Sequence, residues 1–149
     1  MENSVMHWFF FTIFLIMTLV FIWDGKDCFS KKQWLTTGIL LVAVLIATVV
    51  ISVAFKWLSQ SFSIFSIVTA KQYSVIFSMS LLCMWGLKVV VVLLCTLFSG
   101  IMDAHRIHNP ANYERLSSIS GKVAPGLLFI VKGSVSVGSF LMFSGLWLK

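Results

Sequence analysis

The chain has 149 residues, of which 59% are hydrophobic and only 11% are charged. Soluble domains average roughly 45–50% apolar and about 25% charged residues, and a chain this short cannot bury such an apolar excess by itself. The composition therefore excludes a water-soluble domain and predicts one transmembrane domain over residues 1–149, with lipid covering its surface. The net charge of +6 is spread over several short loops, which argues against direct nucleic-acid binding.

Four apolar segments are long enough to be transmembrane helices, and they cover residues 7–23, 35–55, 75–101 and 126–148. The first has neither a basic region before it nor a small-residue cleavage site, so it is predicted to be an uncleaved span and not a signal peptide. The sequence therefore predicts an all-α bundle of four transmembrane helices with both termini on the same side.

Basic residues outside the spans predict the orientation of the bundle. One side carries six of them and the other carries three, namely Lys26, Lys31, Lys32, Arg106, Arg115 and Lys122 against Lys56, Lys71 and Lys149. The positive-inside rule places the richer side in the cytoplasm. Both termini are then expected on the outer side, which is the periplasm of a bacterial cell.

Two connections between the spans are unusual. Residues 58–73 are too polar to span, and they are expected to form either a short helix in the outer interface or an irregular serine-rich loop. Residues 103–125 are the most polar stretch. Their Asn109-Pro110 pair predicts a turn, and Pro125 predicts the start of the last helix. This stretch is the best candidate for cytoplasmic contacts, through His105, Arg106 and His108.

A lysine, Lys88, interrupts the apolar stretch CMWGLKVVVVLLC at residues 83–95. In a span over 75–101 it lies thirteen residues, or roughly 20 Å, from each end. The chain has five acidic residues, and all of them lie outside the spans, namely Glu2, Asp24, Asp27, Asp103 and Glu114. Intramembrane ionisable residues are functional candidates. Lys88 is expected to meet a carboxylate on another protein's helix, to occupy a polar pocket inside the bundle, or to reach the surface by helix tilt.

The last span contains a second lysine and a stripe of small residues. Lys132 lies six residues, or roughly 9 Å, past Gly126 and is expected to extend its ammonium group to the cytoplasmic surface. Ser134 and Gly138 form a small-xxx-small pair that lets helices approach closely. The pair is expected to pack within the bundle or to mediate self-association or docking onto another membrane protein.

No catalytic or cofactor motif is recognisable. Asp103, His105 and His108 have a spacing that could bind a metal, but Asn109-Pro110 interrupts the segment, so a solvated histidine pair is expected there. Nucleophile and phosphate-loop motifs are missing, and no acidic residue lies inside a span to couple ion transport. The sequence therefore predicts a protein that is not an enzyme, has no cofactor, and acts through protein contacts.

The layout of a short chain, no cleaved signal, several spans and no enzymatic motif resembles small, basic inner-membrane proteins of bacterial mobile elements. In particular it is similar to the TraS-like entry-exclusion proteins of F-type conjugative plasmids. The resemblance implies location in the bacterial inner membrane, where the protein would block redundant conjugative DNA transfer by recognising the donor's mating apparatus. Residues 56–73 and 103–122 would then carry specificity.

Three other functions remain open. An immunity protein against a pore-forming bacteriocin would act by helix contacts in the same membrane. An accessory subunit of a larger membrane complex would dock through Lys88 and the small-residue stripe. A four-span enzyme of the glutathione-transferase type is less favoured, because the Arg and Asn positions of that family are not evident. In every case the expected partners are membrane lipid and either another membrane protein or a second copy.

Overall fold

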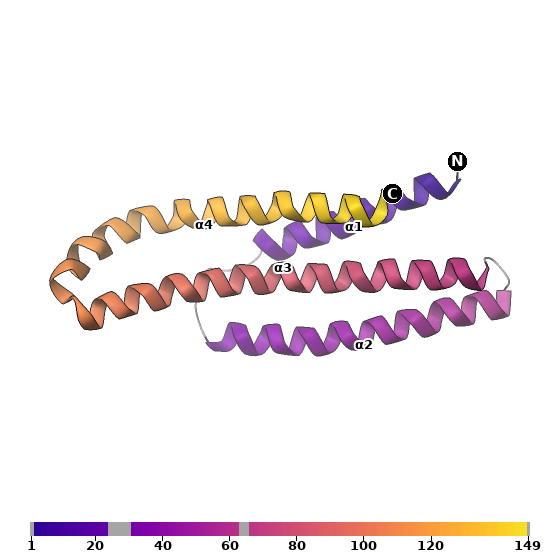
Figure 1. The fold of residues 1–149 in the computed structure, drawn as a ribbon, viewed down its shortest axis with the longest axis horizontal. Coiled ribbons are helices and arrows are strands. Elements are labelled where there is room, and N and C mark those ends of the chain that lie inside the picture. The colour runs from indigo at the N-terminus through magenta and orange to yellow at the C-terminus, as the bar shows by residue number, and fades with distance from the viewer. Residues whose placement is uncertain (1, 24–30, 63–65, 149) are drawn as a thin grey trace.

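The computed structural model describes residues 2–23, 31–62 and 66–148, and these residues form four helices with no strand among them (Figure 1). The helices are α1 (Glu2–Trp23), α2 (Lys31–Phe62), α3 (Ile67–His108) and α4 (Pro110–Trp147). All four are long and apolar enough to cross a membrane. The predicted all-α fold with four transmembrane helices is thus confirmed, and the chain is a multi-pass membrane protein.

Local capping explains where α3 begins and where it gives way to α4. The hydroxyl of Ser66 accepts a hydrogen bond from the backbone N–H of Thr69 at 3.1 Å, which satisfies one of the free donors in the first turn of α3. At the other end, the N–H of Asn109 donates to the carbonyl of His105 at 2.9 Å. Pro110 then occupies the start of α4, where a missing N–H has no consequence.

Both connections that were expected to be loops or interfacial segments are largely helical. In 58–73, α2 continues to Phe62 and α3 begins at Ile67. In 103–125, α3 continues to His108 and α4 begins at Pro110, so Asn109 alone separates them. Pro125 therefore lies inside α4, and the prediction that it starts the last helix is wrong. A proline inside a helix removes one hydrogen bond and bends the axis, and the first part of α4 is curved in Figure 1.

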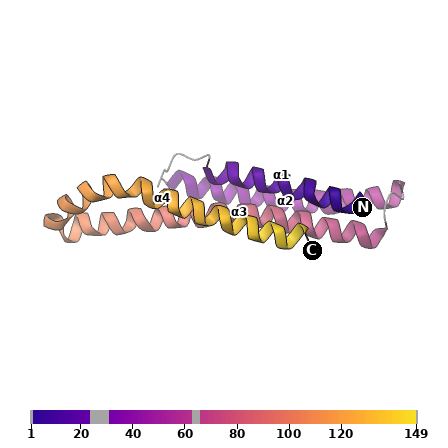
Figure 2. The same ribbon diagram turned by 90° about the horizontal axis from the view of Figure 1, so that it is seen from above.

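Helices α1 and α4 run antiparallel beside each other. The ring centroids of His7 and Trp147 are 6.0 Å apart, and those of Trp23 and Phe129 are 5.5 Å apart. The first turns of α1 therefore meet the last turns of α4, and both chain ends lie toward one end of the bundle (Figures 1 and 2).

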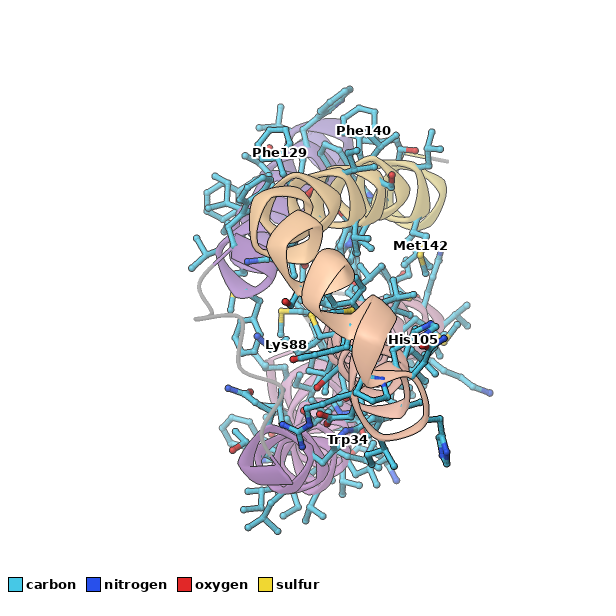
Figure 3. All side chains as sticks on the ribbon, turned by 90° about the vertical axis from the view of Figure 1, so that its left-hand side faces the viewer. Trp34, Lys88, His105, Phe129, Phe140 and Met142 are labelled. Carbon is cyan, nitrogen blue, oxygen red and sulfur yellow. The ribbon has the colours of Figure 1, made fainter. Side chains whose placement is uncertain are left out.

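The packing is a three-helix core with a fourth helix on one side. Helix α3 contacts α1, α2 and α4, whereas α2 packs along α3 and makes no backbone approach to α1 or α4 among the described residues. In the end-on view of Figure 3, α2 (with Trp34) and the α1–α4 pair lie on opposite sides of α3. The outer face of α2 is apolar and exposed, as lipid contact requires, at Leu35, Ile39, Val42, Ile46, Val49 and Val53.

Aromatic side chains fill the core where α1, α3 and α4 meet. Trp147 is 1% exposed and Phe143 is 0% exposed. The Trp147 ring stacks on Phe14 and Phe10, with centroids 5.8 and 5.5 Å away, and meets Phe77 edge-on at 5.2 Å. Offset and edge-on aromatic pairs add specific geometry to packing, so this cluster fixes the register of the three helices.

Helices α3 and α4 are longer than their partners and form a hairpin that projects beyond them (Figure 1). The indole of Trp34, in the first turns of α2, donates to the hydroxyl of Thr96 at 3.0 Å. The part of α3 after Thr96 therefore lies beyond the start of α2. We call residues 97–127, which include the Asn109 break, the projecting hairpin.

Candidate functional site

Lys88 is directed at the last turn of α1. Its Nζ donates a hydrogen bond to the carbonyl oxygen of Phe21 at 3.2 Å and lies 5.9 Å from the centroid of the Phe21 ring. The last four carbonyls of a helix have no partner inside that helix, and they carry the negative end of its dipole. Helix α1 has no basic residue in its last turn. Lys88 therefore supplies from α3 both the donor and the positive charge that the end of α1 lacks.

Lys132 approaches the same end of α1 from α4. It is 7% exposed, and its Nζ lies 5.9 Å from the centroid of a ring of Trp23, the last residue of α1. The Trp23 indole donates to the hydroxyl of Ser136 at 3.2 Å, and that hydroxyl donates to the Lys132 carbonyl at 2.7 Å. Two lysines on different helices thus converge on the C-terminal turn of α1.

Contacts with the neighbouring helices place Lys88 nearer one edge of the bundle than its position within residues 75–101 predicted. Lys88 is level with Phe21, two residues before α1 ends. Thr96, which is level with Trp34, lies eight residues or about 12 Å further along α3. Tryptophan favours the membrane–water interface, so a lysine within that distance can extend toward it. The difference arises because the apolar run of α3 continues past the end of α1.

Of the alternatives for Lys88, the structure shows the polar contact inside the bundle. Figure 3 shows the side chain between α2 and the α1–α4 pair, and Lys88 is half-buried there. The Phe21 carbonyl satisfies one donor of the ammonium group without any carboxylate. The contacts of Lys88 and Lys132 thus link α3 and α4 to the end of α1. Lys132 is buried, so the expectation that its ammonium group extends to the surface is wrong.

The small-xxx-small pair of α4 faces outward. Ser134 is exposed, and a Cβ added at Gly138 would meet no atom within 4 Å among the described residues. The buried side of α4 is instead made by Ser139 and Phe143, both 0% exposed. Among the described residues the pair therefore shows no close approach to another helix, contrary to one of its two expected roles, and Ser134 lies on the exposed side of α4.

Four polar residues near the tip of the hairpin are exposed, namely Asp103, His105, Arg106 and His108. Arg106 Nη2 lies 3.6 Å from Asp103 Oδ1, and both side chains are about 60% exposed, so this ion pair contributes little to stability. No group of three His, Cys, Asp or Glu residues gathers within the part of the chain that the structure describes. His105 and His108 therefore do not form a metal-binding group with described neighbours.

The hairpin also exposes large apolar side chains. Leu97, Ile101 and Ile107 are 55, 58 and 68% exposed, and they lie on the same segment of α3 as the charged tip residues. Exposed apolar groups rimmed by polar ones are typical of protein-interaction surfaces. The sequence indicated the polar tip, but it did not indicate that these apolar residues extend beyond α1 and α2.

Sequence reasoning missed a polar cluster at the opposite end of the bundle. The Tyr73 hydroxyl and His7 Nε2 are 3.3 Å apart, and His7 Nδ1 is buried without a hydrogen-bond partner among the described residues. Lys56 and Lys71 lie at the same end, on α2 and α3. The signal in the sequence was Lys56 just before the polar stretch 58–73 and Lys71 within it.

Comparison of the chain with protein-family models, with curated proteins and with solved structures finds no match. The functional assignment therefore rests on the geometry of the hairpin, the lysines and the two ends of the bundle.

Proposed function

We propose that this protein acts by recognising another membrane protein and that the projecting hairpin is its recognition element. The observation that carries the proposal is the extension of α3 and α4 beyond α1 and α2 (Figures 1 and 2). A helical hairpin with charged residues at its tip and apolar residues along its side offers both orientation and buried area to a partner.

The biological role that we propose is entry exclusion, in which the protein blocks redundant conjugative DNA transfer from the bacterial inner membrane. The count of basic residues puts the hairpin, with Arg106, Arg115 and Lys122, in the cytoplasm. There it would meet a cytoplasmic or membrane component of the transfer apparatus. The resemblance to TraS-like proteins in length, in having several spans and in lacking an enzymatic motif supports this role.

A conjugation assay tests the role. Recipient cells that express the chain are mated with a donor carrying an F-type plasmid, and the transfer frequency is compared with that into cells carrying an empty vector. We expect the wild-type chain to lower the transfer frequency. The tip variant His105→Ala/Arg106→Ala should raise it again by at least about tenfold, because the few residues that dominate an interface each contribute about 2 kcal/mol or more.

The matched control is Val49→Ala, which changes a 63% exposed residue on the outer face of α2. It should exclude transfer as well as the wild type at equal membrane abundance. Transfer into wild-type-expressing cells at the empty-vector frequency would rule out exclusion of that plasmid type. A tip variant as active as the wild type would remove the hairpin from the mechanism.

The outward face of Ser134 and Gly138 favours a second candidate, in which the chain docks a transmembrane helix of a partner. If the chain is an immunity protein, the partner would be a pore-forming bacteriocin. If it is an accessory subunit, the partner would be a larger membrane complex. Gly138→Leu should then abolish protection from the toxin, or co-purification in mild detergent, while the tip variant retains both. Small residues let helices approach closely, so a leucine at this position would block the contact.

A further inference from the structure

A pocket of about 480 Å³ lies between the end of α2 and the start of α3. Its polar lining comes from both helices, namely Ser52, Lys56 and Gln60 of α2 and Lys71 and Ser74 of α3. A second pocket of about 470 Å³ shares Lys71 and Val75 with the first and reaches His7 of α1. The two pockets therefore flank the first turns of α3 at one end of the bundle.

The two serines at the pocket are engaged with protein groups. Ser52 Oγ donates to the carbonyl of Thr48 at 2.9 Å, which uses its one hydrogen. The 2.8 Å contact between Ser52 Oγ and Ser74 Oγ must then be donated by Ser74. Both hydroxyl protons are thus used within the protein, and the donors left for a ligand are the lysine ammonium groups and the Gln60 amide.

Positive charge at the pocket is not neutralised by the described part of the chain. Lys56 and Lys71 are exposed, and the ion pair that the described residues form, between Arg106 and Asp103, lies at the opposite end of the molecule. The dipoles of the two antiparallel helix ends oppose each other here, so they add little net field. The lysines therefore dominate the local potential, and they favour an anion.

The remaining lining is apolar, and two of its three residues are exposed. Ile67 and Val75 are 66 and 54% exposed, whereas Ala70, also in the lining, is 3% exposed. The neighbouring Trp57 of α2 is 58% exposed, as expected for an indole at the level of the headgroups. A ligand for this pocket must combine a negative headgroup with a hydrocarbon chain, because the lysines and the apolar residues line the same space.

We propose that this pocket binds an anionic phospholipid, with its phosphate between the ammonium groups of Lys56 and Lys71. The Gln60 amide would donate to a headgroup oxygen, and an acyl chain would lie along Ile67 and Val75. The volume suits a headgroup and the upper part of one chain, because small-molecule sites span roughly 300–1,000 Å³. This site lies at the opposite end of the bundle from the projecting hairpin and does not depend on the proposed function.

Native mass spectrometry of the full chain in mild detergent tests the proposal, with phosphatidylglycerol and phosphatidylcholine added in equal amounts. The wild type should retain phosphatidylglycerol in preference to phosphatidylcholine. Lys56→Gln/Lys71→Gln should lower the apparent affinity for phosphatidylglycerol by roughly 25-fold, since one lysine near an anionic lipid is worth about fivefold. Binding of phosphatidylcholine should be unchanged.

Two control variants distinguish binding at this pocket from a general attraction of anionic lipid to the positively charged protein. Arg106→Gln/Arg115→Gln removes two positive charges from the hairpin and should keep the wild-type preference. Lys56→Arg/Lys71→Arg retains the charge at the pocket and should also keep it. Equal binding of the two lipids by the wild type, or an equal loss in the hairpin control, would overturn the proposal.

Discussion

Lys88 Nζ and the carbonyl oxygen of Phe21 are joined by a 3.2 Å hydrogen bond, although the two residues are 67 positions apart in the chain. The bond attaches the middle of α3 to the end of α1. Lys132, from α4, places its Nζ 5.9 Å from a ring centroid of Trp23, in the same last turn of α1. The two cations thus hold three helices together at the point where the short helix α1 ends and the longer hairpin continues.

The first prediction concerns this hydrogen bond. Lys88→Met keeps the length of the side chain but leaves the end of α1 without a donor. We expect a loss of about 1 kcal/mol in the free energy of unfolding, because hydrogen bonds between membrane helices average about 0.6 kcal/mol and charged donors give more. Unfolding in mixed detergent micelles measures it. The control Arg106→Met, at the exposed tip, should change stability by less than about 0.5 kcal/mol. A Lys88→Met variant as stable as this control would mean that the bond does not stabilise the fold.

The second prediction concerns the aromatic core. Phe143 is 0% exposed, and Phe143→Ala should lower the free energy of unfolding by about 3–5 kcal/mol, because a cavity forms that the neighbouring rings cannot fill. Leu141→Ala, on the same helix, removes a side chain that is 64% exposed. It should be nearly neutral, since lipid can occupy the vacated space. Equal effects of the two substitutions in the same micelle titration would place residue 143 outside the core.

A double-mutant cycle tests the buried contact between Trp147 and Ser80. Trp147 Nε1 donates to Ser80 Oγ at 3.0 Å, and Ser80 is 0% exposed. Ser80→Ala should cost about 1–3 kcal/mol because it leaves the indole N–H without an acceptor. The variant Trp147→Phe has no indole N–H that could lose its acceptor. Adding Ser80→Ala to that variant should therefore lower the free energy of unfolding by clearly less than Ser80→Ala does in the wild type. Additive effects, with a coupling energy near zero, would show that the indole finds another acceptor.

The fourth prediction concerns the depth of the hairpin. Ile101 and Met79 are 58 and 46% exposed, but Ile101 lies on the projecting hairpin and Met79 lies beside α1 and α2. Single cysteines at these positions, in a chain without its native Cys28, Cys83 and Cys95, can be tested with a water-soluble maleimide. We expect rapid labelling at residue 101 and little at residue 79, because water surrounds one site and lipid the other. Equally slow maleimide labelling at both positions would place residue 101 inside the bilayer.

The helical character of the chain followed directly from its composition, whereas the helix ends did not. Residues 58–62 and 67–73 include several polar side chains, yet they continue α2 and α3, because a helix keeps its own backbone hydrogen bonds whichever side chains it exposes. The same holds for 110–125, where α4 is curved (Figure 1) but continues through Pro125. Polarity marks the edge of the membrane more reliably than it marks the edge of a helix.

The sequence by itself determined that this chain lives in lipid, that it crosses the membrane as helices, and that Lys88 has no acidic partner within the spans. Each of these depends only on which residues occur and on their order. Tertiary structure decided that, among the described residues, the backbone of α2 approaches α3 alone, that Ser134 lies on the exposed side of α4, and that Lys88 meets the carbonyl of Phe21. The reason is geometric: a helical sequence specifies which residues share a face, but the rotation and axial offset between helices are set by the packing of side chains from all of them at once.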